Sequence, residues 1–249
     1  MFGLPVSAGP FDADVIVLGE FHDNLFHHGR QAESVADIQP SALVFEMLTP
    51  EQATAHVPGA DADTLEAAFD WTQSGWPDFS LYFPIFAAAP DARVFGAGVP
   101  RDAARSAMTD GLAFAFGIGA EAYGLTDPLD PAEQEAREAL QMAAHCDALP
   151  PEMLPAMVDI QRLRDAELAK MTLRAFQLAG GPVVVITGNG HARTDWGMTR
   201  YLNRAAPEIS VTTVGQTEDG APLQGTFDLL LDSPSVPRDD PCAAFNTKD

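Results

Sequence analysis

The sequence is poor in cysteine and in basic residues, and each shortage excludes a class of protein. Its two cysteines, Cys146 and Cys242, are too few for a disulfide framework and lack C-x-x-C spacing. We therefore expect two free thiols in a reducing compartment. Lysine and arginine total 14 against 36 acidic residues, which gives a net charge of −22. Such a surface repels phosphate backbones and anionic lipids, so we expect no nucleic-acid partner and no binding to membrane surfaces.

Long apolar runs are also missing. No stretch approaches the roughly 18 consecutive apolar residues of a membrane-spanning helix, so we expect no membrane span. The first residues show no basic region, apolar run or lipobox cysteine, which predicts a cytoplasmic protein without a signal peptide. The cell envelope is the expected location if the natural N-terminus has been trimmed. With 46% hydrophobic residues, the 249-residue chain can form a sizeable globular core.

Short, continuous apolar runs predict buried parallel strands, because parallel strands are covered on both faces. These runs are residues 15–18, 42–45, 93–99 and 183–187, with 209–214 and 227–231 as additional edge strands. Residues 24–38 predict a helix capped by Asp23 or Asn24, so the chain opens with a β-α-β arrangement. The fold class is therefore α/β: a mainly parallel sheet flanked by helices.

The remaining segments predict one domain over residues 1–232. Residues 103–180 read as a helical insertion or cap, whose longest helix covers about 152–179. An aromatic, proline-bearing loop is expected through Trp76, Phe79, Tyr82 and Phe86. Residues 233–249 are rich in proline and aspartate and predict a loose tail.

Polar side chains follow the strand runs. Gly19-Glu20-Phe21-His22 follows the first run, and Gly188-Asn189-Gly190-His191 follows the fourth. Glu46 ends the second run, and Arg101 comes shortly after the third. Ligands of open parallel sheets bind at the carboxyl ends of the strands, so we expect these side chains to meet in one cleft.

Two carboxylates, two imidazoles and a guanidinium allow more than one chemistry. Glu20, His22, Glu46 and His191 could ligate a divalent metal, or the set could act in acid/base chemistry while Arg101 holds an anion. Each member also has an ordinary structural reading, such as a solvated loop residue or a helix-end arginine. Gln161 and Asp165 share one helix face and either reach this site or only solvate that face.

Several segments together resemble the ChaN-like haem-binding family. These segments are Gly19 to Asn24 with His28 and Gln31, Phe45-Glu46-Met47 with Glu51-Gln52, Tyr82-x-Pro84-Ile85, Val99-Pro100-Arg101, Gln161 with Asp165, and Gly188 to His191. The resemblance spans about residues 15–205 and extends to a wider group that includes Tiki-type proteases, TraB-like proteins and erythromycin esterases. It implies a bacterial protein with the shared cluster Glu20, His22, Glu46, Arg101 and His191.

The resemblance also implies haem binding, a role in iron uptake, a tyrosine as iron ligand and a homodimer that encloses the haem. Tyr82 is then the first candidate ligand, with Tyr123 and Tyr201 as others, and His28 and Arg101 are additional haem contacts. Our first hypothesis is a haem-binding protein of iron acquisition or haem handling. The alternative is a metal-dependent hydrolase, of the Tiki-protease or esterase kind, using Mn, Zn, Co or Fe in the same cluster. Whether the protein is an enzyme stays open between these two.

Overall fold

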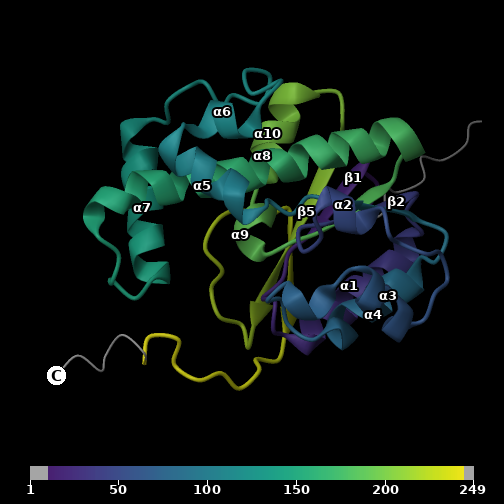
Figure 1. Ribbon diagram of the computed structural model, residues 1–249. Coiled ribbons are helices and arrows are strands. Elements are labelled where there is room, and N and C mark those ends of the chain that lie inside the picture. The colour runs from purple at the N-terminus through teal and green to yellow at the C-terminus, as the bar shows by residue number, and fades with distance from the viewer. Residues whose placement is uncertain (1–10, 244–249) are drawn as a thin grey trace, which may run out of the picture.

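The computed structural model describes residues 11–243 and is built on a parallel six-stranded sheet (Figure 1). The strands are β1 (Val15–Leu18), β2 (Ala42–Phe45), β3 (Arg93–Gly96), β4 (Val183–Ile186), β5 (Val211–Glu218) and β6 (Leu229–Ser233). Their order across the sheet is β3-β2-β4-β1-β5-β6, and every neighbouring pair is parallel. The α/β prediction is confirmed. Of the two expected edge strands, β6 lies at the edge, whereas β5 lies between β1 and β6.

Alternate side chains of the central strands enter two separate apolar cores. Val15 and Val17 of β1 point to one core, whereas Ile16 and Leu18 point to the other. All four residues are essentially inaccessible to solvent. The sheet is therefore covered on both faces, which explains why its strands read as unbroken apolar runs.

Helices from different parts of the chain form the two covering layers (Figure 1). One layer contains α1 (Leu25–Ile38), α2 (Pro50–Ala53), α3 (Ala62–Ala68) and α4 (Phe79–Ala88). The other contains α5 (Arg101–Thr109), α6 (Leu112–Phe116), α8 (Leu154–Ala179) and α10 (Met198–Ala205), with α7 (Pro131–Ala144) packed on α8. The short helix α9 (Asn189–Ala192) follows β4 directly. The predicted helical segment between β3 and β4 thus covers one face of the sheet.

The segment expected to be an aromatic loop is helix α4 instead. Asp78 caps this helix by accepting a hydrogen bond from the Ser80 backbone N–H at 2.8 Å. The buried side chains Phe79, Tyr82, Ile85 and Phe86 follow helical spacing and pack on the sheet. The free energy gained by burying these side chains outweighs the loss of the one backbone hydrogen bond that Pro84 cannot donate inside the helix.

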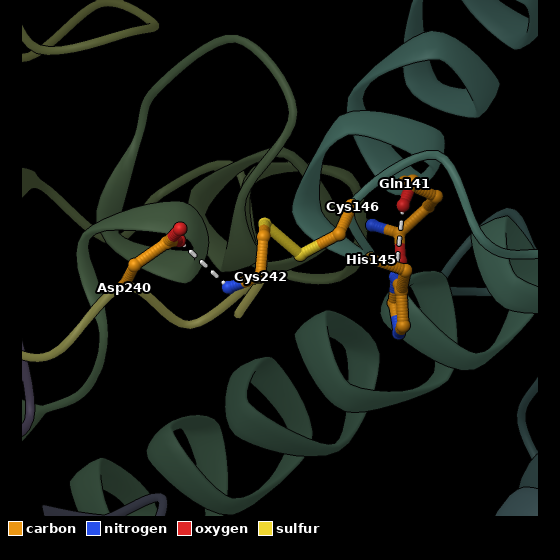
Figure 2. Close-up of a disulfide and its surroundings, with 5 residues drawn as sticks. All are labelled: Gln141, His145, Cys146, Asp240 and Cys242. Atoms are coloured by element: carbon orange, nitrogen blue, oxygen red, sulfur yellow. Dashed lines mark hydrogen bonds between the residues drawn. A yellow bond between two sulfur atoms is a disulfide. The ribbon is translucent and has the colours of Figure 1, made fainter. Parts of the chain in front are cut away.

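The expectation of two free thiols is wrong. Cys146, just after α7, and Cys242, near the end of the described chain, form a disulfide across 96 residues (Figure 2). The described part of the predicted loose tail, residues 234–243, contains no helix or strand but is attached through this disulfide. Within residues 11–243, no helix is long and apolar enough to cross a membrane.

Candidate functional site

The loop after β1 carries Glu20 and His22 into the site. Asn24 caps α1 by accepting hydrogen bonds from the backbone N–H groups of Phe26 and His27, which fixes where the loop ends. The Nδ1 of His22 lies 2.7 Å from Glu20 Oε1. Glu20 is buried, whereas about a third of the His22 side chain is exposed. The carboxylate therefore orients an imidazole that still reaches the surface of the site.

Glu46, at the end of β2, holds the loop after β4. Its Oε2 accepts hydrogen bonds from the Thr187 hydroxyl at 2.6 Å and from the Gly188 backbone N–H at 2.9 Å. A parallel register pairs Phe45 with Ile186, so the two strand ends lie side by side. The neighbouring strands β2 and β4 thus bring residues 141 and 142 positions apart in sequence into direct contact.

The imidazole of His191 lies between two carboxylates. Its Nδ1 is 2.7 Å from Asp165 Oδ1, and its Nε2 is 3.5 Å from Glu46 Oε1. Asp165 projects from the long helix α8, which crosses one face of the sheet. Gln161 lines a small cavity beside His191 and Asp165, so this face of α8 reaches the site rather than only solvent.

Gly188 allows His22 to approach the loop after β4. A Cβ at this position would lie 2.9 Å from His22 Nε2 and 3.8 Å from Glu46 Oε2. His22 and His191 therefore both lie near Glu46, and the Nδ1 atom of each ring faces a second carboxylate, Glu20 or Asp165. The paired Gly-x-x-His motifs and Glu46 are brought together in one cluster.

Electrostatics in this cluster favour charged imidazoles around a charged carboxylate. Burial acts to lower the pKa of His191, but the charges of Glu46 and Asp165 outweigh it and raise that pKa to about 9. Burial acts to raise the pKa of Glu46, yet His191, His22 and the two donated hydrogen bonds lower it to about 2. For His22, the Glu20 hydrogen bond and the nearby carboxylate charges overcome burial, so its pKa is also raised.

A cleft of about 300 Å³ opens beside Glu46 at the carboxyl edge of the sheet. Its apolar wall includes Met47, Trp76, Val99 and Leu168, and two guanidinium groups, Arg101 and Arg164, also line it. The ring of Trp76 is 4.8 Å from that of His22, which places the partly exposed imidazole next to the cleft. Among the described residues, neither arginine forms an ion pair with a carboxylate.

Tyr82 and His28 lie behind this cluster rather than in the cleft. Tyr82 is fully buried, and its hydroxyl donates a 3.0 Å hydrogen bond to Glu20 Oε1. His28 is also buried, with Nε2 2.9 Å from the His22 carbonyl oxygen and its ring packed edge-on against Tyr82. The other two tyrosines, Tyr123 and Tyr201, are buried around a different small cavity. In this arrangement no tyrosine hydroxyl is presented to the cleft.

Metal-ligand geometry is not found within residues 11–243. No group of three or more His, Cys, Asp or Glu side chains there is placed to hold a metal ion. The carboxylates of the cluster are instead engaged by protein donors, Glu20 by Tyr82 and His22, and Glu46 by Thr187 and Gly188. The alternative of a divalent-metal site is therefore unsupported.

Three members of the site were missed or left open in the sequence. The i, i+4 spacing of Gln161 and Asp165 indicated a shared helix face in the sequence. Only the packing of α8 shows that the Asp165 side chain reaches His191. Arg164 and Trp76 carried no motif. Arg164 lies one residue from Asp165 on a helix with buried residues along most of its length. Trp76 lies in the short connection before α4, beside Asp78, which caps that helix.

A family model described as haem-binding uptake, Tiki superfamily, ChaN matches residues 11–202, which is more than half of the chain. No curated protein matches the sequence. The structure of cofacial haem binding to ChaN of Campylobacter jejuni is similar, with a TM-score of 0.62, 18% identity, and coverage of 87% of this chain and 86% of the other. The type III effector HopBA1 is a weaker likeness, at TM-score 0.45 and 14% identity over 92% and 95% of the two chains. At its identity, the first likeness shows a shared fold.

Proposed function

This chain belongs to the ChaN family of haem-binding uptake proteins in the Tiki superfamily, and we propose that it binds haem at the carboxyl edge of its sheet. The haem would occupy the cleft beside Glu46, in a role in haem handling or iron acquisition. The observation that carries this proposal is the pairing of apolar cleft walls with Arg101 and Arg164. Basic residues are scarce in this chain, 14 in all with a net charge of −22, so two guanidinium groups lining one cleft stand out.

The residues of the cleft fit the chemical needs of a porphyrin. A haem requires an apolar surface for its ring, cations for its propionates and an axial ligand for iron. Trp76 and Leu168 offer apolar surface, and the two arginines offer the charge-assisted hydrogen bonds that carboxylates accept. The cleft volume of about 300 Å³ is smaller than a whole haem needs, so part of the ring would stay outside it.

We propose His22 rather than Tyr82 as the residue that would hold the iron. Tyr82 is buried and bonded to Glu20, whereas His22 is a third exposed and packs on Trp76 at the cleft. A carboxylate that accepts from one imidazole nitrogen fixes the tautomer and makes the other nitrogen a better ligand. Glu20 stands in that relation to His22, because it faces Nδ1, and iron binding at Nε2 would displace the proton that the raised pKa of His22 favours there.

Haemin titration of the purified protein tests this assignment. We expect a saturable Soret shift that weakens at least about tenfold in His22→Ala. His56→Ala, at a histidine that packs on Phe69 and Phe86 away from the cleft, is the matched control. A protein that shows no saturable shift would contradict haem binding, and an unchanged shift in His22→Ala would contradict the ligand alone.

We also propose that the protein works in an oxidising compartment such as the cell envelope. Disulfides persist outside the reducing cytosol, and the Cys146–Cys242 bond supports that location over the cytoplasmic one expected from the sequence. Thiol counting on protein isolated from its native cells under alkylating conditions tests this. We expect no reactive thiol before reduction and two after it, and two free thiols at the outset would contradict the proposal.

A homodimer is the assembly we propose for the haem-bound form. Phe21, Leu25 and Phe26, in and after the β1–α1 loop, are large apolar side chains that are between about 38% and 53% exposed. Covering them together with the outer part of a haem would remove this apolar surface from water. Sedimentation of the protein with and without haemin tests the assembly, with dimerisation expected on binding. Phe26→Ser should weaken that dimerisation without changing the monomer fold.

Metal-independent hydrolysis is a second candidate, favoured by the two carboxylate–imidazole pairs around Glu46. An imidazole oriented by Asp165 or Glu20 is suited to general acid–base work. The raised pKa of His191, about 9, makes it an acid rather than a base at neutral pH. Ester hydrolysis that persists in EDTA and is lost in His191→Ala would support this role. Inactivity across ester and peptide panels would exclude it.

A further inference from the structure

The described end of the chain forms a strap with two attachment points. Strand β6 ends at Ser233, and the C-terminal strap (residues 234–242) then leaves the sheet without regular structure and runs toward α7 (Figure 1). No side chain of residues 234–243 belongs to either apolar core. Polar contacts and one covalent bond are therefore what hold this segment on the molecule.

The first attachment point is the β1–α1 loop. Asn24 Nδ2 donates a 3.0 Å hydrogen bond to the Pro234 carbonyl oxygen. Arg238 pairs through both sides of its guanidinium, with Asp23 at 2.6 Å and with Glu218 at 2.6 to 2.7 Å. The same guanidinium lies 5.5 Å from the Phe21 ring. The strap thus touches residues on either side of His22, which sits in the middle of this loop.

The second attachment point is the Cys146–Cys242 disulfide at the end of α7 (Figure 2). Cys242 is four residues beyond Arg238, so the covalent bond keeps the guanidinium close to Asp23 and Glu218. Partly exposed ion pairs contribute little by themselves, and Arg238 and Asp23 are about 33% and 49% exposed. The disulfide adds a covalent restraint to these ion pairs and so makes the strap persistent.

The disulfide lies near the protein surface. Both cysteines are only partly buried, and their neighbours Asp147 and Pro241 are exposed. Cys146 and Asp147 both have positive φ, 58° and 55°, which non-glycine residues adopt at an energetic cost. Breaking the bond therefore frees a turn that has its own tendency to relax.

We propose that the Cys146–Cys242 disulfide is a thiol-sensitive latch that holds the C-terminal strap across the β1–α1 loop and so fixes His22 in place. A dithiol opens the latch: its first thiolate attacks one sulfur, its second thiol closes onto the first, and two protein thiols form as the dithiol is oxidised by two electrons. The released strap keeps its non-covalent contacts with Asn24, Asp23, Glu218 and the Phe21 ring. The loop that carries His22 keeps its own hydrogen bonds, among them that between His28 Nε2 and the His22 carbonyl oxygen, but it loses the tethered strap over Asp23 and Asn24 and so opens more often.

This inference goes beyond haem binding and does not depend on it. Amide hydrogen exchange of the haem-free protein, oxidised or treated with dithiothreitol, measures it directly. We expect exchange at Phe21 and Asn24, whose backbone N–H groups donate hydrogen bonds to His27 Nδ1 and to the Phe21 carbonyl oxygen, to accelerate about tenfold or more on reduction, while the strands keep their protection. The variant C146S/C242S should show the fast pattern without reductant, and dithiothreitol should not change it further.

Two results would overturn the latch. In the first, reduction leaves exchange at Phe21 and Asn24 unchanged. In the second, protection from amide exchange falls equally across β1, β4 and the loop, which would mean that the disulfide stabilises the whole fold. Arg238→Ala with the disulfide intact separates the two attachment points. It should accelerate exchange at Phe21 and Asn24 less than reduction does, because Cys242 still holds the strap end.

Discussion

The Tyr82 hydroxyl donates a 3.0 Å hydrogen bond to Glu20 inside the protein. Burial and the charge of Glu20 both raise the pKa of this phenol, so it stays protonated and remains a donor. Glu20 in turn faces Nδ1 of His22 at 2.7 Å. A buried tyrosine therefore positions the carboxylate that positions the imidazole, and its role is to support the site from behind.

Tyr82→Phe should destabilise the fold without abolishing haem binding. The change removes one donor from the buried Glu20 carboxylate, and hydrogen bonds to charged groups contribute about 1.5–3 kcal/mol. Chemical denaturation measures that loss, and a haemin titration should still give a Soret shift. Tyr123→Phe, whose ring packs on Phe116 away from the site, is the control. Loss of the Soret shift in Tyr82→Phe would mean that the phenol turns outward to bind iron.

Gly188→Ala should displace the His22 imidazole while leaving the fold intact. Its new Cβ would lie 2.9 Å from Nε2 of His22, at the end of a side chain that can move. We expect histidine NMR titration to show the His22 pKa falling toward its usual value as the ring moves from Glu46. Stability should change by about 1 kcal/mol or less. Gly190→Ala is the matched control because nothing lies within 4 Å of its Cβ position.

Removing Arg101 and Arg164 together should weaken haem binding through the propionates. Both guanidinium groups line the cleft, so R101A/R164A should lower haemin affinity about tenfold or more. The affinity for a porphyrin dimethyl ester, which has no carboxylates, should not change. Arg105→Ala is the control, since Arg105 is exposed and faces Asp102 instead. An equal loss for haemin and the ester would show that the arginines act on folding rather than on propionates.

Stability should fall as the pH rises from about 6.5 through 9, because of His191. Its folded pKa of about 9 lies above the unfolded value of 6.5. The protonated ring therefore stabilises the fold fully below pH 6.5, and this contribution disappears as the pH passes the folded pKa. The difference in pKa corresponds to about 3 kcal/mol. Urea denaturation across this range measures the slope. His191→Gln should flatten the fall in stability with pH. His56→Gln should leave it unchanged, because burial lowers the pKa of His56 below its usual value.

The strands and their ends were predictable because buried parallel strands have a simple pattern in the sequence. Each is a continuous apolar run, and polar residues begin where it stops. The rule that ligands bind at carboxyl ends then groups Glu20, His22, Glu46 and His191, and the structure places these four together. Arg101 lies in the adjoining cleft rather than within the hydrogen-bonded cluster.

The rest depended on contacts that no local pattern records. Pro84 made α4 look like a loop, and only the buried aromatic face of that helix shows why it forms and why Tyr82 points inward. The partner of Cys146 lies 96 residues away, so no spacing rule identifies it. The side chain of Asp165 could equally have faced solvent until the packing of α8 fixed its direction.

The strand order also determines when the site can exist during synthesis. Val15 of β1 pairs with Val183 and Val211, so the first strand made has neighbours that emerge only in the last third of the chain. The ribosome releases this chain from its N-terminus, so β1 and the loop after it, which carries Glu20 and His22, must wait unpaired until then. Closing such distant contacts is slow. Truncated or stalled chains lacking β4 therefore display an unpaired, apolar β1 to chaperones and contain no functional cluster at all.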